Sequence, residues 1–290
     1  MLEALLFDAA SAIARLFPVD SVSNFGARLF RTLGPLTGAH RVAERNLRIA
    51  FPDACDSEIR RLLRAQWTEL GRSLTEFVII DRIVADTGRV EIEGLERLRA
   101  IAVGDRPVVF ISGHFSNFEL MAAAIVRAGV KCQVTYRAMN NPYVDARVRR
   151  VRYRYGVRLF APKGLDGARE LMRALERGES VALMNDQKFN GGVEAPLFGV
   201  TAHTAPGPST FALRFGVPLQ PLSVQRVGDA ARFRVIVHDP IALEDTGDKA
   251  ADVEAGVRRI NAFIEDRVRA RPAEWFWVHR RWPNEVYGKR

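Results

Sequence analysis

Residues 108–119 read Val-Val-Phe-Ile-Ser-Gly-His-Phe-Ser-Asn-Phe-Glu, an apolar run followed by a glycine, a histidine and a glutamate. The run 108–112 is short and apolar, which is typical of a buried strand. Gly113 permits a tight exit from the strand, and a helix is expected over 119–128, ending near Gly129. The change from strand to helix predicts the βα unit of a layered α/β protein.

The same alternation of strand and helix continues toward the C-terminus. The expected strands are 131–136, 158–160, 180–184, 219–225 and 232–238, the expected helices are 142–155, 165–177, 208–215 and 252–269, and a glycine-rich loop is expected between 184 and 208. The pattern predicts an α/β fold in which a central mixed sheet is flanked by helices.

Residues 1–85 look helical instead, with the clearest apolar stripe along 65–80. No linker rich in Pro, Gly and Ser divides the chain. We therefore expect a single domain over 1–290, in which 1–85 is a mostly helical N-terminal part and about 86–283 is the catalytic α/β core.

Composition limits the classes of function. The 290 residues are 48% hydrophobic, enough to bury a full core, and the formal net charge of +9 implies an acidic partner such as nucleic acid, an anionic membrane surface or an acidic substrate carrier. Cys55 and Cys132 are the only cysteines, and neither has metal-ligand spacing, so we expect neither a disulfide framework nor a metal site.

The first 17 residues combine apolar side chains at helical spacing with Glu3, Asp8 and Arg15. These charges argue against a signal peptide and against a membrane span. We expect an amphipathic helix here, which either packs on the protein's own core or inserts into a membrane interface.

His114 comes directly after the expected strand 108–112, where open α/β sheets place their ligands, and Glu119 follows five residues later. A carboxylate that shares a hydrogen bond with an imidazole fixes its tautomer and stabilises the imidazolium. We therefore expect His114 to be a general base that Glu119 orients; the alternative is a structural histidine. The motifs of serine hydrolases, zinc proteases and nucleotide-binding loops are absent, so no cofactor is expected.

The box His114-Phe-Ser-Asn-Phe-Glu119 resembles the HX4(D/E) motif of the bacterial lipid A biosynthesis acyltransferases, the lauroyl and myristoyl transferases of the lysophospholipid-acyltransferase-like superfamily. Further blocks resemble that family in the same order: 45–52, 134–142, 184–199 and 277–282. The box departs from the family's usual Gly-Asn-Trp, because Ser116, Asn117 and Phe118 stand there.

The resemblance implies transfer of a fatty acyl group from a thioester of acyl carrier protein or coenzyme A to a hydroxyl of a lipid A precursor. It implies a place at the cytoplasmic face of the bacterial inner membrane, peripheral or N-terminally anchored, and no nucleic-acid partner. Alternatives are another glycolipid acceptor, such as a phosphoinositide mannoside, and a catalytically idle lipid-binding protein. Glu119 favours lipid A, because mannoside acyltransferases usually have Asp there.

The expected substrate-binding residues are Asn117, Arg137, Asp186, Gln187, Glu194, Arg280 and Arg281. Among these, Arg137 is a candidate for oxyanion stabilisation or for a structural ion pair. Asp186 is expected to hold polar groups of the substrate or a nearby basic residue, and Glu194 is an acid expected to approach His114 from a facing loop. Arg280 and Arg281 stand beside Trp277 and Trp282, which predicts a membrane-interface edge.

Two further sets of side chains fit a lipid substrate. The arginines of the helix 142–155 are expected to bind acidic headgroups or an acidic carrier, or to form a solvated face: Arg147, Arg149, Arg150, Arg152 and Arg154. Apolar residues expected either to line an acyl trough or to belong to the core are Phe118, Leu120, Met121, Phe198 and Phe211.

Overall fold

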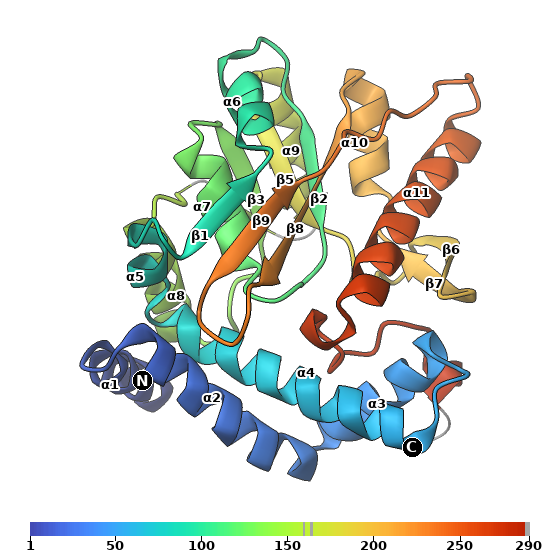
Figure 1. Cartoon of the computed structure of the whole chain (residues 1–290). Helices are drawn as coiled ribbons and strands as arrows, with labels where there is room; N and C mark the ends of the chain where they lie inside the picture. Colours follow the sequence, from blue (N-terminus) through green and yellow to red (C-terminus); the bar gives the residue numbers. More distant parts are fainter. Residues whose placement is uncertain (159, 163–164, 288–290) are drawn as a thin grey trace.

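The structure is a computed structural model that describes residues 1–158, 160–162 and 165–287. Its N-terminal part consists of helices, and strands begin only after residue 85 (Figure 1). These helices are α1 (Leu2–Arg15), α2 (Val19–Leu33), α3 (Gly38–Ala50), α4 (Asp56–Phe77) and α5 (Ile80–Ala85), with the short 3-10 turn η1 (Gly34–Leu36). Helices α2 and α4 lie side by side, because Gly26 and Gly71 let the two backbones approach: a Cβ on Gly26 would lie 2.3 Å from the Gly71 carbonyl oxygen.

The centre of the protein is a seven-stranded sheet with the order β1-β9-β8-β2-β5-β3-β4. Its strands are β1 (Val90–Glu93), β2 (Val109–Ser112), β3 (Cys132–Tyr136), β4 (Phe160–Pro162), β5 (Ser180–Met184), β8 (Leu219–Arg226) and β9 (Phe233–Val237). Neighbouring strands are parallel except β8 and β9, so the sheet is mixed. The predicted α/β class with a helical N-terminal segment is confirmed.

Helices cover both faces of the sheet (Figure 1). They are α6 (Leu95–Val103), α7 (Glu119–Arg127), α8 (Pro142–Arg154), α9 (Leu165–Glu176), α10 (Gly207–Phe215) and α11 (Lys249–Ala270), followed by the 3-10 turns η2 (Pro272–Glu274) and η3 (Asn284–Tyr287). The chain runs from β2 through β3 to β4 in one direction across the sheet and returns through β5 to β8 in the other. Because such crossovers are right-handed, α7 and α8 lie on one face and α9 and α10 on the opposite one.

Three parts of the sheet structure differ from the sequence-based expectation. The edge strand β1 was not expected. The expected glycine-rich loop contains a hairpin of β6 (Val193–Leu197) and β7 (Val200–Thr204), which packs against α11. Its two-residue turn, Phe198-Gly199, has φ of 54° and 72°. A phenylalanine in the left-handed region is uncommon, so the turn had no recognisable sequence signal. The expected strand 158–160 is β4, displaced toward the C-terminus; residue 159 lies outside the described residues.

Helices α2 and α4 lie across the end of the sheet at which β2, β5 and β8 terminate (Figure 1). Arg226, the last residue of β8, forms ion pairs with Glu69 and Glu76 of α4. The N-terminal helices therefore border the edge of the sheet from which the loop containing His114 departs. Among the described helices, none combines the length and the apolar character that crossing a membrane requires.

Candidate active site

His114 and Asp186 form a hydrogen-bonded pair at the carboxyl edge of the sheet. Nδ1 of His114 lies 2.7 Å from Oδ1 of Asp186, and the backbone N–H of His114 donates to Oδ2 of the same carboxylate at 2.7 Å. A carboxylate accepts hydrogen bonds only, so the proton of the neutral imidazole is on Nδ1 and Nε2 is its basic nitrogen. The imidazole packs between the rings of Phe118 and Phe276.

The register of two parallel strands brings this pair together. Ser112 of β2 is the register partner of Met184 of β5, and both are the last residues of their strands. His114 and Asp186 each follow two residues after the end of their strand. The two residues therefore lie at the same distance along the chain beyond the carboxyl edge of the sheet. Gly113 lies between the end of β2 and His114, and a Cβ at this position would lie 2.8 Å from the ring of Phe115. A residue with a side chain here would therefore displace that ring.

Asp186 is completely buried and is held by several donors. The indole N–H of Trp275 donates to its Oδ2 at 2.8 Å, in addition to the two contacts from His114. Burial alone would raise the pKa of the carboxyl group, but the adjacent imidazoles of His114 and His279 and the hydrogen bonds from His114 more than offset this and lower the pKa of Asp186 below its ordinary value. Asp186 is therefore ionised at neutral pH and stabilises a proton on His114.

The carboxylate of Glu119 is bound by Arg152 and Tyr155, whereas its spacing in the sequence predicts a contact with His114. This carboxylate accepts hydrogen bonds from Nε of Arg152 at 2.9 Å and from the hydroxyl of Tyr155 at 2.5 Å, and it also contacts Nη2 of Arg152. The expected Glu119–His114 hydrogen bond is replaced by Asp186–His114, because α7 begins at Glu119 and the side chain is engaged by α8. The guanidinium of Arg152 also lies 4.7 Å from the centroid of the Tyr136 ring.

A cavity of about 620 Å³ opens beside His114. Its polar lining includes Glu119, Arg137, Arg152 and Gln187. Much of the remaining wall is apolar: Phe77, Phe110, Met121, Ile125, Val157 and Leu222. The arrangement joins a basic imidazole nitrogen to an apolar space of the kind that accommodates a hydrocarbon chain.

The structure brings some of the predicted substrate-binding residues together and separates others. Arg137 and Gln187 line the cavity with His114, whereas Glu194 is exposed on β6 and belongs to neither cavity that His114 lines. The amide of Asn117 is buried and donates to Glu76 at 3.0 Å.

The aromatic C-terminal segment is mostly interior. Arg281 is fully buried and donates to the Thr204 hydroxyl at 2.6 Å, and Trp277 and Trp282 are fully buried as well. Arg280 is exposed and lies over the ring of Tyr287. The tryptophans are core residues, so the expected aromatic membrane edge is not found at these two positions.

The arginines of α8 are largely engaged within the protein. Arg147 pairs with Asp8 of α1, Arg149 with Asp145, and Arg152 with Glu119. The Arg147–Asp8 pair docks α1 onto α8, and the three pairs together lower the number of arginines free to bind an acidic partner. Of the five apolar trough candidates, Phe118 and Met121 line the cavity, and Leu120, Phe198 and Phe211 are buried elsewhere.

The sequence predicts that Asp186 holds polar groups of the substrate or a nearby basic residue, but it does not identify His114 as that residue. The signal that identifies its contact is the shared offset of two residues after strands 108–112 and 180–184, which becomes informative only once β2 and β5 are known to be neighbours. Trp275 is not among the predicted site residues, and Arg152 is predicted only as one of the helix arginines that bind an acidic partner; the contact of each with the site comes from a distant element. No group of three or more His, Cys, Asp and Glu side chains among the described residues is arranged to hold a metal ion.

Known proteins resemble this chain over most of its length. The family described as "Bacterial lipid A biosynthesis acyltransferase" matches residues 4–284. The Escherichia coli (strain K12) lipid A biosynthesis lauroyltransferase is 26% identical over 257 residues, covering 86% of this chain and 80% of that protein. The palmitoleoyltransferase of the same organism is 24% identical, with the same coverage, and its myristoyltransferase is 24% identical, covering 87% of this chain and 78% of that protein.

Among solved structures, the 1-acyl-sn-glycerophosphate acyltransferase of Thermotoga maritima aligns with 87% of this chain and 97% of its own. The TM-score is 0.37 and the sequence identity 15%.

Proposed function

The chain belongs to the bacterial lipid A biosynthesis acyltransferase family and is an acyltransferase, and we propose that it transfers a fatty acyl group from a thioester to a hydroxyl of a lipid A precursor. The proposed donor is a thioester of acyl carrier protein or of coenzyme A, and no other cofactor takes part. The observation that carries the proposal is the His114–Asp186 pair beside the apolar cavity.

In the proposed mechanism, Nε2 of His114 takes the proton from the acceptor hydroxyl while the oxygen attacks the thioester carbonyl. The tetrahedral intermediate collapses, the carbon–sulfur bond breaks, and the imidazolium returns its proton to the departing thiolate. Asp186 holds the imidazole by Nδ1 and stabilises its cationic form between these two steps. We assign this orienting role to Asp186 and give Glu119 the role of holding Arg152 at the cavity wall.

A general base contributes about 10²- to 10⁴-fold in rate, so other groups must supply the rest of the catalysis. The oxygen of the tetrahedral intermediate carries negative charge, which donors fixed in advance stabilise best. Arg137 and Gln187 line the same cavity as His114 and are the proposed contacts for this oxygen and for polar groups of the substrates.

The proposed site of action is the cytoplasmic face of the inner membrane, with peripheral attachment. Support comes from α1, on which Leu2, Leu5, Leu6 and Ile13 are exposed together with the following Leu16 and Phe17. Apolar side chains on a helix with this distribution insert into the interfacial region of a bilayer. Co-sedimentation with vesicles of anionic phospholipid tests this point: a Leu5→Glu/Leu6→Glu variant should bind less, and equal binding would contradict attachment through α1.

The function is tested by incubating the purified protein with acyl carrier protein and coenzyme A thioesters of several chain lengths. Each donor is combined with a lipid A precursor or with a phosphoinositide mannoside, and the lipid products are weighed by mass spectrometry. Addition of one acyl mass to the lipid A precursor supports the proposal. Acylation of the mannoside alone would assign another glycolipid acceptor, and binding without any product would assign an idle lipid-binding protein.

A further inference from the structure

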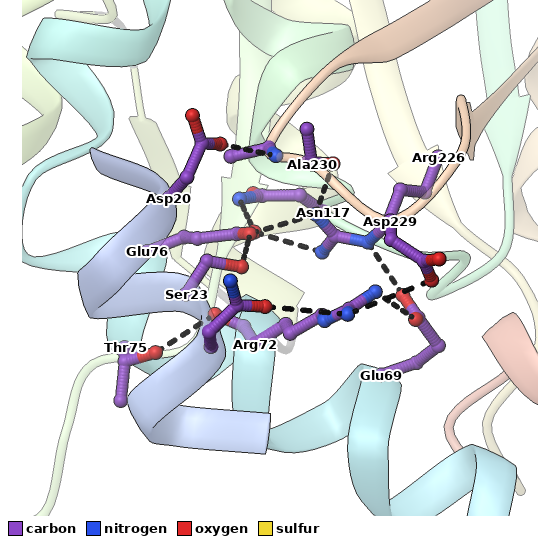
Figure 2. A network of polar contacts seen from close by, with 12 residues as sticks. Asp20, Ser23, Glu69, Arg72, Thr75, Glu76, Asn117, Arg226, Asp229 and Ala230 are labelled. Carbon is purple, nitrogen blue, oxygen red and sulfur yellow. Dashed lines mark hydrogen bonds and ion pairs between the residues drawn. The ribbon is translucent and has the colours of Figure 1, made fainter. Parts of the chain in front are cut away.

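A buried polar cluster joins the N-terminal helices to the loop that contains His114 (Figure 2). At its centre is Glu76, in the last turn of α4, which is fully buried. Its carboxylate accepts hydrogen bonds from the hydroxyl of Ser23 at 2.6 Å, from the amide of Asn117 at 3.0 Å and from two guanidinium nitrogens of Arg226 at 2.8 and 3.0 Å. These partners come from α2, the His114 loop and β8.

The buried charges of the cluster are balanced within it. Arg226 is buried and also pairs with Glu69 at 2.7 Å, and Arg72 pairs with the other oxygen of Glu69 at 3.1 Å (Figure 2). In the buried part of the cluster two carboxylates thus face two guanidinium groups, and the exposed Asp229 is a third carboxylate, 3.8 Å from Arg72. A buried ion pair with several hydrogen bonds has a defined geometry, because any displacement leaves a charge without a partner.

The loop that Asn117 belongs to is constrained on several sides. Ser116 has φ of 42°, in the left-handed region that a serine rarely adopts, so this conformation requires support from its surroundings. The N–H of Ser116 donates to the carbonyl oxygen of Glu274 at 2.7 Å, and Asp186 holds the N–H of His114. The Asn117–Glu76 hydrogen bond is a buried side-chain contact that ties the loop to the helical layer.

We propose that Glu76 is a positioning residue that acts through Asn117 to hold the His114 loop in the conformation needed for proton transfer. The inference rests on the proposed function, because it assigns how the N-terminal helices serve that reaction. Asn117 therefore acts on His114 through the backbone of the loop, and its amide is committed to Glu76 in place of substrate. Small displacements of a reacting group reduce rates strongly, about 10²-fold for an error near 1 Å.

The proposal can be tested by exchanging the carboxylate of Glu76 and the amide of Asn117 between the two positions. Asn117→Asp places a second carboxylate against Glu76, and the repulsion should displace the loop. The double variant Glu76→Gln/Asn117→Asp restores both a donor and an acceptor at the contact. The amide introduced on α4 can donate to the carboxylate introduced in the loop, and the total charge stays as in the wild type. Thr75→Ala is the matched control, because Thr75 binds the Val22 carbonyl oxygen at the same α2–α4 interface without touching Asn117.

We expect Asn117→Asp to lower kcat by about 10- to 100-fold with KM changed less than about 3-fold. The double variant should recover part of kcat, because it restores the contact with the loop but leaves Glu69 as the ionic partner of Arg226 in place of Glu76. Thr75→Ala should keep kcat while lowering the melting temperature. All variants are assayed below their melting temperatures, so that loss of folded protein does not enter kcat. Nitrogen-15 NMR of the His114 ring, recorded in parallel, should change in Asn117→Asp and return in the double variant.

Wild-type kcat in Asn117→Asp would overturn the inference, and so would a double variant that regains stability but not activity. A loss of kcat in Thr75→Ala equal to that in Asn117→Asp would also overturn it, since general loosening would then explain both. If the wild type transfers no acyl group with any donor, the proposed function fails, and the NMR comparison alone decides whether Glu76 positions His114.

Discussion

Nδ1 of His114 lies 2.7 Å from Oδ1 of Asp186, although the two residues are 72 positions apart in the sequence. Substituting Asp186→Asn replaces an acceptor that stabilises the imidazolium with a neutral amide that can favour the wrong tautomer. We expect kcat to fall by about 10²-fold or more, with a smaller effect on KM. Steady-state kinetics of acyl transfer measure both, and an Asp186→Asn enzyme with wild-type kcat would exclude the orienting role.

Glu119→Gln tests the role assigned to Glu119. The amide can still accept hydrogen bonds from Arg152 and Tyr155, but the buried guanidinium loses its counter-charge. We expect stability to fall by about 3 kcal/mol, measured by urea unfolding, and activity to fall less than in Asp186→Asn. If Glu119→Gln instead removes activity as completely as Asp186→Asn does, without loss of stability, Glu119 acts on the chemistry directly.

Local patterns in the sequence predict most strands of the central sheet and the position of His114, but neither β1 and the β6–β7 hairpin nor the partner of His114. The apolar runs 108–112 and 180–184 correspond closely to β2 and β5, because buried parallel strands have a strong local signal. Which strands are neighbours depends on crossovers between distant segments. Glu119 was therefore chosen for its proximity in sequence, whereas Asp186 reaches His114 through the β2–β5 pairing.

The pairs that fix the rest of the site are equally remote in sequence. Arg152 contacts Glu119 across 33 positions, and Glu76 contacts Asn117 across 41. Composition and periodicity identify such residues as charged or polar but do not identify their partners. The buried ion pair between Glu76 and Arg226 interrupts the apolar pattern of α4 and β8, and only the tertiary structure explains it.

Ala182→Phe tests whether the cavity receives the acyl chain. Ala182 lines the cavity from β5, and a benzyl group there reduces the space available. Because each buried methylene contributes about 0.8 kcal/mol, the loss of room for two or three methylenes should favour shorter donors by roughly 10-fold or more. Relative kcat/KM for a series of saturated thioesters measures the shift, with the shortest donor as the internal control. An unchanged preference would place the acyl chain elsewhere.

His238 is expected to make stability depend on pH. The pKa of His238 is lowered to about 4 from an ordinary value of 6.5. Burial is the larger cause, and the positive charge of Arg267 is the smaller one. The unfolded chain therefore binds this proton at higher pH than the folded protein, so stability should fall as the pH decreases from about 6.5 to about 4. After allowance for partial contact with water, the loss is on the order of 1 kcal/mol.

Urea unfolding at pH 7 and pH 4.5 measures this contribution. The control variant His238→Gln has no titrating ring, and its amide can still bind Ser223, whose hydroxyl lies 2.7 Å from Nε2 of His238. The difference in stability between the two pH values should be smaller in this variant than in the wild type. An equal difference in both proteins would assign the pH dependence to other groups.

The central claim, that His114 transfers the proton, is tested most directly by a single-turnover assay of His114→Ala with the preferred thioester donor, followed by mass spectrometry of the acylated lipid. If His114 is the general base, the rate of acyl transfer should fall by about 10²-fold or more, while donor binding, measured separately, and the melting temperature stay close to those of the wild type. A folded His114→Ala protein that acylates the lipid at the wild-type rate would contradict the central claim.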